Sequence, residues 1–194
     1  MSLFGTTFAD PDDDDGRESI YDSFDSSSTG STADRLRHVA NRITCRWLLR
    51  LDMPRVLAIE ELSCENPMHE REFSDLLKIG NTVARVAEID GHVCGFSVYS
   101  LGKRSISLLN LAVDPDFRRN GVGRKLIGKL VEALSANRRH KIDVRVRERN
   151  LAGLLFLKAC GFLATGTDRE WYTDTQEDAI LMSLDMNHNG STFV

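Results

Sequence analysis

The chain has 194 residues, of which 41% are hydrophobic and 28% charged, enough for one core of ordinary size and too few for a second full domain. It contains no run of about 18 apolar residues, and its N-terminus lacks the basic-then-apolar order of a signal peptide, so we expect a cytoplasmic protein that does not engage a membrane. Its four cysteines form no Cys-x-x-Cys pair and its five histidines have no metal-ligand spacing, so we expect neither disulfides nor a bound metal ion.

Charge is distributed unevenly along the chain. Residues 1–34 hold nine acidic side chains and one basic one, a net charge of −8 against −4 for the whole chain, so the remainder carries +4. Segments such as PDDDDG and DSSSTGST bury too little apolar surface to offset the entropy of ordering, so we expect residues 1–42 to form a disordered acidic arm. The alternative is a docking arm anchored by Ile20, Tyr21 and Phe24. The expected folded domain is 43–186, followed by a flexible tail, 187–194.

The first half of this domain is predicted to contain a strand, two helices and an antiparallel meander. A strand is expected over ITCRWLLRL, and the two helices follow from apolar residues at helical spacing. Asp90-Gly91 tolerates the positive φ of a tight turn, so the segments on either side should pair as a hairpin, with SISLLNLAV as the next strand. The predicted elements span residues 43–51, 54–62, 69–78, 82–89, 92–101 and 105–113.

The second half alternates helices with strands. Leucines and isoleucines recur at helical spacing after residue 122, and KIDVRVR alternates strictly, with its charged residues on one face. Gly161 is expected to end the second of these helices. The order of elements predicts an α+β domain. The predicted elements span residues 122–137, 141–147, 150–159, 162–166 and 178–184.

The most informative stretch is LLNLAVDPDFRRNGVGRKLIGKL, in which a buried strand runs through a turn into a helix. Glycines let a ligand approach the backbone, the N–H groups of a helix N-terminus point outward, and the helix dipole adds about half a positive charge. Three arginines, Arg118, Arg119 and Arg124, reinforce this anion cradle. The third glycine of a Rossmann motif and the Gly-Lys-Ser/Thr of a P-loop are absent. A pyrophosphate is therefore the expected ligand, with a plain strand-to-helix turn as the alternative and no nucleic acid expected.

Two stretches resemble the GNAT superfamily of acetyl-CoA-dependent N-acetyltransferases. Arg118-x-x-Gly121-x-Gly123 after LNLAVDP resembles the acetyl-CoA signature, and ERNLAGLLFLKACGF resembles the Asn-x-x-Ala…Gly-Phe segment. The resemblance covers about 43–184 and implies a GNAT fold, a central mixed, mostly antiparallel sheet of six to seven strands flanked by about four helices. RWLLRLDMPRVLAIE and EDAILM are similar to RimI-type members, which acetylate protein N-terminal amines, typically on a small-subunit ribosomal protein.

The resemblance also implies which residues hold acetyl-CoA. Backbone groups near the end of SISLLNLAV would bond the pantetheine arm, residues 119–124 would hold the pyrophosphate, and Asn150 would contact the coenzyme. In this family the fourth strand and the strand carrying Asp143 splay apart to make a slot for the thioester. The implied coenzyme-binding residues are Leu111, Ala112, Val113, Arg118, Arg119, Asn120, Gly121, Val122, Gly123, Arg124 and Asn150.

The catalytic residues of the resemblance are replaced in this chain. RimI-type enzymes resemble one another in using a carboxylate base and a tyrosine acid, and those positions align here with Arg145 and Leu157. Arginine stays protonated and leucine has no proton to give, so neither can do that chemistry. Asp143 could act as base through a water, with Tyr99 or Tyr172 as acid, or could be a surface carboxylate paired with a neighbouring arginine. Otherwise positioning alone carries the reaction, or the chain binds acetyl-CoA without transferring the acetyl group.

The acceptor site is altered as well. An Asn-Pro-Met loop at 66–68 stands where the family has an aromatic-Pro-aromatic loop. The proline of this loop and Glu60, which lies earlier in the chain, agree with the family. Trp171 and the tyrosine after it resemble the paired aromatics of the opposite wall. The expected acceptor is a protein N-terminal α-amine, with a polyamine or an aminoglycoside as the alternative, and the chain is expected to be a monomer or homodimer. The residues expected to contact the acceptor are Glu60, Pro67, Met68 and Tyr172.

Overall fold

One sheet of seven strands organises the protein, in the order β1-β2-β3-β4-β5-β7-β6. The structure is a computed structural model that describes residues 42–134 and 138–186, so the predicted acidic arm and C-terminal tail lie outside the described residues. All neighbouring strands are antiparallel except β4 and β5. The strands are β1 (Ile43–Trp47), β2 (Thr82–Ile89), β3 (His92–Leu101), β4 (Ser105–Val113), β5 (Lys141–Arg147), β6 (Leu163–Tyr172) and β7 (Glu177–Asp185).

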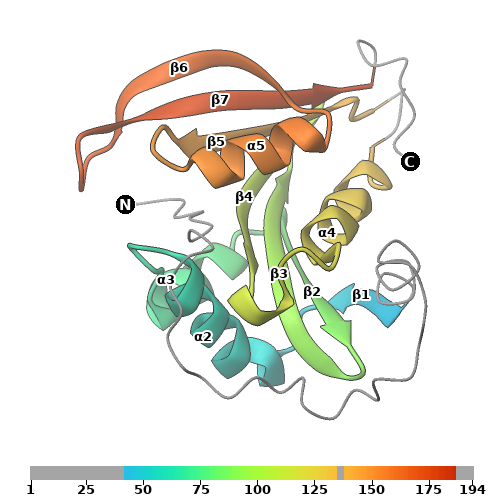
Figure 1. Ribbon diagram of the computed structural model, residues 1–194. Coiled ribbons are helices and arrows are strands. Elements are labelled where there is room, and N and C mark those ends of the chain that lie inside the picture. Colours follow the sequence, from blue (N-terminus) through green and yellow to red (C-terminus); the bar gives the residue numbers. More distant parts are fainter. Residues whose placement is uncertain (1–41, 135–137, 187–194) are drawn as a thin grey trace, which may run out of the picture.

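Helices cover both faces of the sheet (Figure 1). Two of them, α2 and α3, enclose an apolar cluster around Val56, Phe73 and Phe96 on one face. The other two, α4 and α5, enclose a larger cluster that includes Leu126 and Leu157 on the opposite face. The helices of the described residues are η2 (Arg50–Asp52), α2 (Met53–Ser63), α3 (Glu70–Leu77), η3 (Pro115–Phe117), α4 (Val122–Val131) and α5 (Leu151–Ala159).

This architecture confirms the predicted α+β class and the mostly antiparallel sheet. The hairpin turn between β2 and β3 lies at Asp90 and Gly91, whose φ angles are 51° and 81°. Gly161 ends α5 with a φ of 88°, and the amide of Phe162 donates to the carbonyl of Leu157 at 3.0 Å. The local signals of turn and helix end were therefore sufficient to find these boundaries.

Two other boundaries differ from the prediction. Helix α4 ends at Val131, not near residue 137, because the amides of Ala133 and Leu134 donate to carbonyls three residues back, at 3.1 and 3.0 Å, and tighten the last turn. Strand β6 is ten residues long, twice the predicted length, because it pairs with β7 past two register shifts. Its side chains are mostly exposed, which removed the apolar alternation that would have revealed it.

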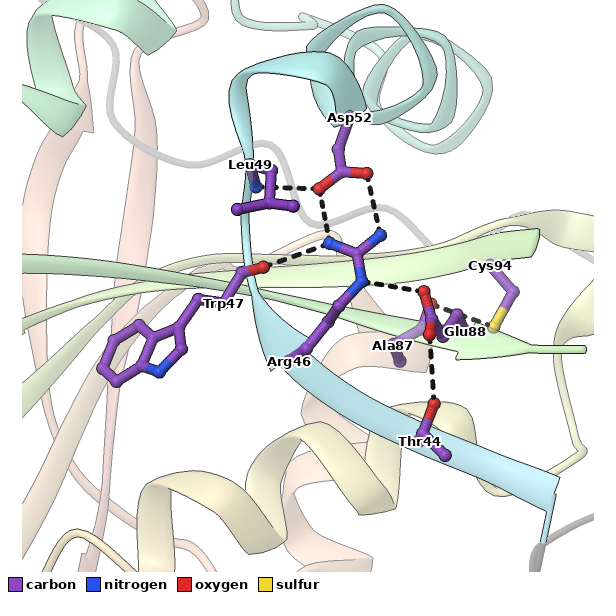
Figure 2. A network of polar contacts seen from close by, with 8 residues as sticks. All are labelled: Thr44, Arg46, Trp47, Leu49, Asp52, Ala87, Glu88 and Cys94. Atoms are coloured by element: carbon purple, nitrogen blue, oxygen red, sulfur yellow. Dashed lines mark hydrogen bonds and ion pairs between the residues drawn. The ribbon is translucent and has the colours of Figure 1, made fainter. Parts of the chain in front are cut away.

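The first strand is shorter than predicted because Asp52 turns the chain into α2 (Figure 2). The carboxylate of Asp52 accepts a hydrogen bond from the amide of Leu49 at 2.8 Å and two from Arg46 at 2.7 and 2.9 Å. Arg46 Nε also donates to Glu88 of β2 at 2.9 Å. This network joins β1, β2 and the start of α2 around a carboxylate that is almost completely buried.

The four cysteines are free thiols within the fold. Cys64, Cys94 and Cys160 are buried, and Cys45 is partly buried. Burial raises the pKa of the Cys94 thiol to about 12 and also raises the pKa of the Cys45 and Cys160 thiols. These thiols therefore remain protonated near neutral pH.

We expect Asp52→Asn to lower the free energy of unfolding by about 2–3 kcal/mol at pH 7, because it replaces a buried charge-assisted pair by a neutral contact. Hydrogen bonds from Arg46 hold the pKa of Asp52 below its ordinary value. This stabilisation is therefore fully present above about pH 4 and is lost as the pH falls through the lowered pKa. Urea unfolding of both proteins at pH 7 and at decreasing pH measures the difference.

The control is Asp75→Asn, which removes an exposed ion pair with Lys78. Its effect should stay within about 0.5 kcal/mol at every pH. If the two variants lost the same free energy of unfolding at pH 7, a stabilising role for the buried contact between Arg46 and Asp52 would be contradicted.

Candidate functional site

Two neighbouring strands separate in the middle of the sheet. β4 and β5 pair in parallel only as far as Leu108 and Val144. Beyond these residues β4 continues to Val113 and β5 to Arg147 without pairing to each other. The two strands therefore diverge and leave a slot between their carboxyl-terminal halves.

A β-bulge in β4 lies where the strands separate. Val98 of β3 pairs with Asn110 and Tyr99 pairs with Leu108, which leaves Leu109 as the extra residue. A bulge bends its strand and places two residues opposite one on the partner. Leu109 packs on the cluster beneath α2 and α3, and Asn110 bonds to Glu60 of α2, so both side chains lie on the same face.

The slot is lined on three sides. Its empty volume, including the part open to solvent, is about 350 Å³. The lining comes from residues 108–111 of β4, residues 144–146 of β5, and Gly153, Phe156 and Leu157 of α5. Asn110 and Arg145 are the two polar residues among the ten that line it. The slot is therefore an apolar passage with one polar group on each strand.

The turn before α4 has the backbone geometry of an anion cradle. Arg119 and Gly121 both have positive φ, at 64° and 88°, and Gly121 is the exposed N-cap of the helix. The first hydrogen bond of the helix runs from the amide of Lys125 to the carbonyl of Gly121 at 2.9 Å. The amides of residues 122–124 precede it, so they point outward along the helix axis. The positive end of the helix dipole is at the same place.

Two glycines fix α5 beside the slot. A Cβ on Gly123 would lie 2.9 Å from the ring of Phe156, so α4 and α5 approach closely there. A Cβ on Gly153 would lie 2.7 Å from Nδ2 of Asn150. Asn150 caps α5 by accepting the amide of Gly153 at 2.8 Å on its Oδ1, and its buried Nδ2 has no hydrogen-bond partner among the described residues.

Arg145 and Leu157 lie on opposite sides of the slot. The Nε of Arg145 donates to Asp168 of β6 at 2.8 Å, and its guanidinium stacks on the ring of Trp171 at 4.2 Å from the centroid. Leu157 is buried in the α5 wall and belongs to the larger core cluster. Strand β5 thus contributes a cationic residue to the lining of the slot, and α5 contributes a hydrocarbon residue.

Behind Asn110 lies a buried carboxyl group. The Nδ2 of Asn110 donates to both carboxyl oxygens of Glu60, at 3.1 and 3.0 Å. The amide of Met68 donates to the same side chain at 3.3 Å. Burial raises the pKa of Glu60. Glu60 therefore joins α2, the loop that follows it and the bulged part of β4, while Met68 packs into the core beneath α2 and α3.

Comparison with known proteins shows the family of this chain. The chain matches the Acetyltransferase (GNAT) family over residues 46–162. The chain belongs to this family. It is 30% identical over 147 residues to ribosomal protein bS18-alanine N-acetyltransferase of Salmonella typhimurium, an alignment that covers 73% of this chain and 96% of that one.

Solved structures of GNAT proteins have the same fold. The ribosomal-protein-S18-alanine N-acetyltransferase of Escherichia coli superposes with a TM-score of 0.67 at 27% identity, covering 78% of this chain and 99% of that one. Ard1 from Thermoplasma volcanium has a TM-score of 0.67 at 26% identity, with 74% and 97% covered. The predicted family and fold are thus confirmed, and the chain is an N-acetyltransferase of a family that uses acetyl-CoA as co-substrate.

The arginines of the GNAT signature have different roles in this structure. Arg118 is half-buried, its Nε donates to the carbonyl of Val113 at 3.2 Å, and burial lowers the pKa of its guanidinium. Arg119 is exposed, and Arg124 donates to the carbonyl of Ala159 at 3.4 Å while remaining exposed. Arg118 therefore stabilises the turn from inside, whereas the side chains of Arg119 and Arg124 are exposed.

Asp143 lies outside the slot. It accepts a hydrogen bond from Ser183 at 2.6 Å and pairs with Lys141 at 2.9 Å, not with the arginines that follow it on β5. It stands where β4 and β5 are still paired. The carboxylate of Asp143 is therefore engaged by two ordinary contacts, with Ser183 and Lys141.

The two tyrosines predicted as acids occupy different places. Tyr99 is buried beneath α4, and its hydroxyl accepts a hydrogen bond from Arg85 at 3.2 Å. Tyr172 is buried against Leu109, its ring is covered by Arg147 at 4.0 Å, and burial raises the pKa of its hydroxyl. Its hydroxyl has no hydrogen-bond partner in the described part of the chain. Tyr172 therefore lies beside a lining residue of the slot, whereas Tyr99 belongs to the core.

Sequence reasoning missed the contacts of three residues in and around the slot. The polar side chain of Asn110 interrupts the apolar run LLNLAV, and this interruption was the sequence signal that could have identified it. Asp168 carries no local signal, because its partner Arg145 is 23 residues away. Arg147 was expected on the charged face of KIDVRVR, and the structure buries it there between Asp174 at 2.7 Å and Glu177 at 3.3 Å, which belong to the turn after β6 and to β7.

Within residues 42–134 and 138–186, no helix has both the length and the apolar character to cross a bilayer. In the same ranges, no three metal-ligand side chains converge on one point.

We expect Gly121→Glu to weaken acetyl-CoA binding by at least about tenfold, because it adds a negative charge and a side chain where a pyrophosphate would meet the helix amides. The measurement is titration calorimetry with acetyl-CoA. Gly128→Glu is the control, because it adds the same charge to the same helix and a Cβ there meets nothing within 4 Å. Unchanged affinity in a folded Gly121→Glu protein would remove the cradle from the coenzyme site.

Proposed function

We propose that this enzyme acetylates the α-amine of protein N-termini, with a ribosomal protein as the first acceptor to test. The relatives from Salmonella typhimurium and Escherichia coli are named for an alanine of ribosomal protein bS18, which supports this acceptor class. The observation that carries the proposal is Arg145, a fixed cation that lines the slot where a general base would be needed.

A slot without a base selects among amines by their pKa. The attacking amine must be neutral, because an ammonium group has no lone pair. An α-amine has a pKa of about 7.7–8.0, so roughly a tenth of it is neutral at pH 7, against well under a thousandth of a lysine-like amine with a pKa of about 10.4. A nearby guanidinium further disfavours the ammonium form. The slot therefore favours N-terminal α-amines over the primary amines of lysines and polyamines.

We infer that the coenzyme runs from the α4 cradle into the slot. The amides of residues 122–124 and the exposed Arg119 and Arg124 would hold the pyrophosphate, and the backbone of residues 111–113 would hold the pantetheine arm. The buried Nδ2 of Asn150 is a donor without a partner in the described residues, which fits a contact with the coenzyme. The thioester would then lie between β4 and β5, against Leu157.

In the proposed reaction the neutral amine attacks the thioester carbonyl, the C–N bond forms and the C–S bond breaks. Water takes the proton of the amine, since Arg145 cannot accept it. The departing thiolate takes a proton from solvent, because burial raises the pKa of Tyr172 and so makes its hydroxyl a weaker acid than the thiol that would form. Positioning of the two reactants supplies the main part of the acceleration, a contribution of about 7–11 kcal/mol at best.

We expect the rate with a peptide that begins with alanine to rise with pH up to the pKa of its α-amine, at about 7.7–8.0. Initial rates of coenzyme release between pH 6 and 9, at saturating acetyl-CoA, measure this curve. A plateau that begins well below the pKa of the amine would contradict the solvent route and indicate a protein base.

A base introduced at residue 145 should raise the rate at neutral pH. Arg145→Glu alone would place two carboxylates side by side, so the variant to test is Arg145→Glu combined with Asp168→Asn. We expect it to be faster by at least about tenfold at pH 7. Asp143→Asn should cost less than about tenfold, and a loss of about 100-fold or more with intact coenzyme binding would identify Asp143 as the base.

A further inference from the structure

Asn110 presents an unused hydrogen-bond acceptor in the wall of the slot. Its side chain is 2% exposed, and its Nδ2 is held by both oxygens of Glu60. Because Glu60 fixes the amide in this orientation, Oδ1 must point away from the carboxyl group. Oδ1 is buried and has no hydrogen-bond partner among the described residues. A buried carbonyl oxygen without a partner is costly, so a ligand that donates an N–H group would be favoured there.

Arg145 presents unused donors on the opposite strand. A guanidinium has five N–H donors, and here only Nε is engaged, with Asp168. The four N–H groups on the two Nη nitrogens make no hydrogen bond within the described residues, and the side chain is 40% exposed. Stacking on Trp171 and the bond to Asp168 hold the plane of the guanidinium in place. A carboxylate that reaches the Nη edge can therefore form a bidentate pair without reordering the arginine.

The neighbouring cations of β5 do not offer the same contact. Arg147 is buried, and its guanidinium bonds to Asp174, Thr175 and Glu177. Lys141 lies at the start of β5, outside the slot lining, and pairs with Asp143. Arg145 is thus the cation of this strand that lines the slot.

We propose that the preferred acceptor carries a carboxylate close to its reactive amine, as does a protein N-terminus whose first residue is Asp or Glu. An N–H of the amine bonds to Oδ1 of Asn110, and the carboxylate bonds to the Nη edge of Arg145 across the slot. Burial strengthens the contact at Asn110, and the bidentate geometry of the guanidinium strengthens the contact at Arg145. This inference deepens the proposed function and rests on it, because it names which N-termini the site takes. It also sets the chain apart from the relatives that are named for alanine.

The test compares acceptors that carry or lack a carboxylate, each at the same concentration of neutral amine, because a carboxylate beside the amine raises the pKa of that amine. One arm uses two peptides of identical sequence that begin with Asp or with Asn, next to a third that begins with Ala. The other arm uses free alanine and alaninamide, which carry the carboxylate or a neutral amide beside the same amine. Coenzyme release gives kcat/KM for each acceptor with the wild-type protein, Arg145→Gln and Lys141→Gln. Calorimetry with acetyl-CoA confirms that each variant is folded and binds the coenzyme.

We expect the wild-type protein to prefer the Asp peptide over the Asn peptide by about tenfold or more in kcat/KM, mainly through a lower KM, as for a charge-assisted pair. Arg145→Gln should bring this ratio close to one. Lys141→Gln removes a positive charge from the same strand outside the slot and should leave the ratio unchanged, which separates a specific contact from the general charge of the surface.

The remaining outcomes separate this inference from the proposed function. Equal use of the Asp and Asn peptides, or a preference that survives in Arg145→Gln, would overturn the carboxylate contact while leaving acetylation of N-termini in place. Acetylation of free alanine but not of alaninamide or any peptide, lost in Arg145→Gln, would support the contact and refute the protein N-terminus. If the protein bound acetyl-CoA but acetylated none of the acceptors in either arm, both the carboxylate contact and the proposed function would be refuted.

Discussion

The rest of the structure depends on the loss of hydrogen bonding between β4 and β5 beyond Leu108 and Val144. Unpaired strand edges inside a protein are costly, because every buried N–H and C=O needs a partner. Each strand tolerates the separation because it is secured on its other side: β4 pairs with β3 up to Val113, and β5 pairs with β7 up to Arg147. The edges that remain face a slot in which an extended ligand arm can supply the missing partners. Five residues of β4 and three of β5 are thus left without each other as partners at this edge.

The elements around this slot hold one another in place. Glu60 connects α2 to the bulged part of β4. The hydrogen bonds between Arg46 and Asp52 fix the point where α2 begins. On the other face the close contact between Gly123 and Phe156 sets the distance from α4 to α5, so the cradle and the α5 wall keep a fixed relation. The cation of β5 is fixed in a similar way, because Arg145 is held by the carboxylate of Asp168 and the ring of Trp171. Preorganisation of this kind reduces the cost of ordering a substrate.

The sequence was most informative where structure is decided locally. Gly121 before α4, the Asp90-Gly91 turn and the end of α5 at Gly161 all depend on backbone freedom at one or two residues, and all have positive φ. The motif resemblance led to the slot as well. Contacts between distant residues could not be predicted, because no periodic pattern links Arg145 to Asp168 or Asn110 to Glu60.

The alternation of residues along the strands predicted which face a side chain lies on but not whether it is buried. It placed Arg147 correctly on the face of Asp143 and Arg145, yet Arg147 is buried, because a turn from another part of the chain closes over it. The bulge at Leu109 shifts the alternation of β4 by one residue, which no count along the sequence reveals.

The buried cysteines have a consequence for an enzyme that works with a thioester. A thiolate near bound acetyl-CoA could take the acetyl group by thioester exchange, which would acylate the protein and waste the coenzyme. Thiols attack thioesters only as thiolates, and burial raises the pKa of Cys45, Cys94 and Cys160. None of the four cysteines is among the residues that line the slot. The chain therefore protects the acetyl group from its own sulfur atoms, and self-acylation on cysteine should not compete with transfer to an amine.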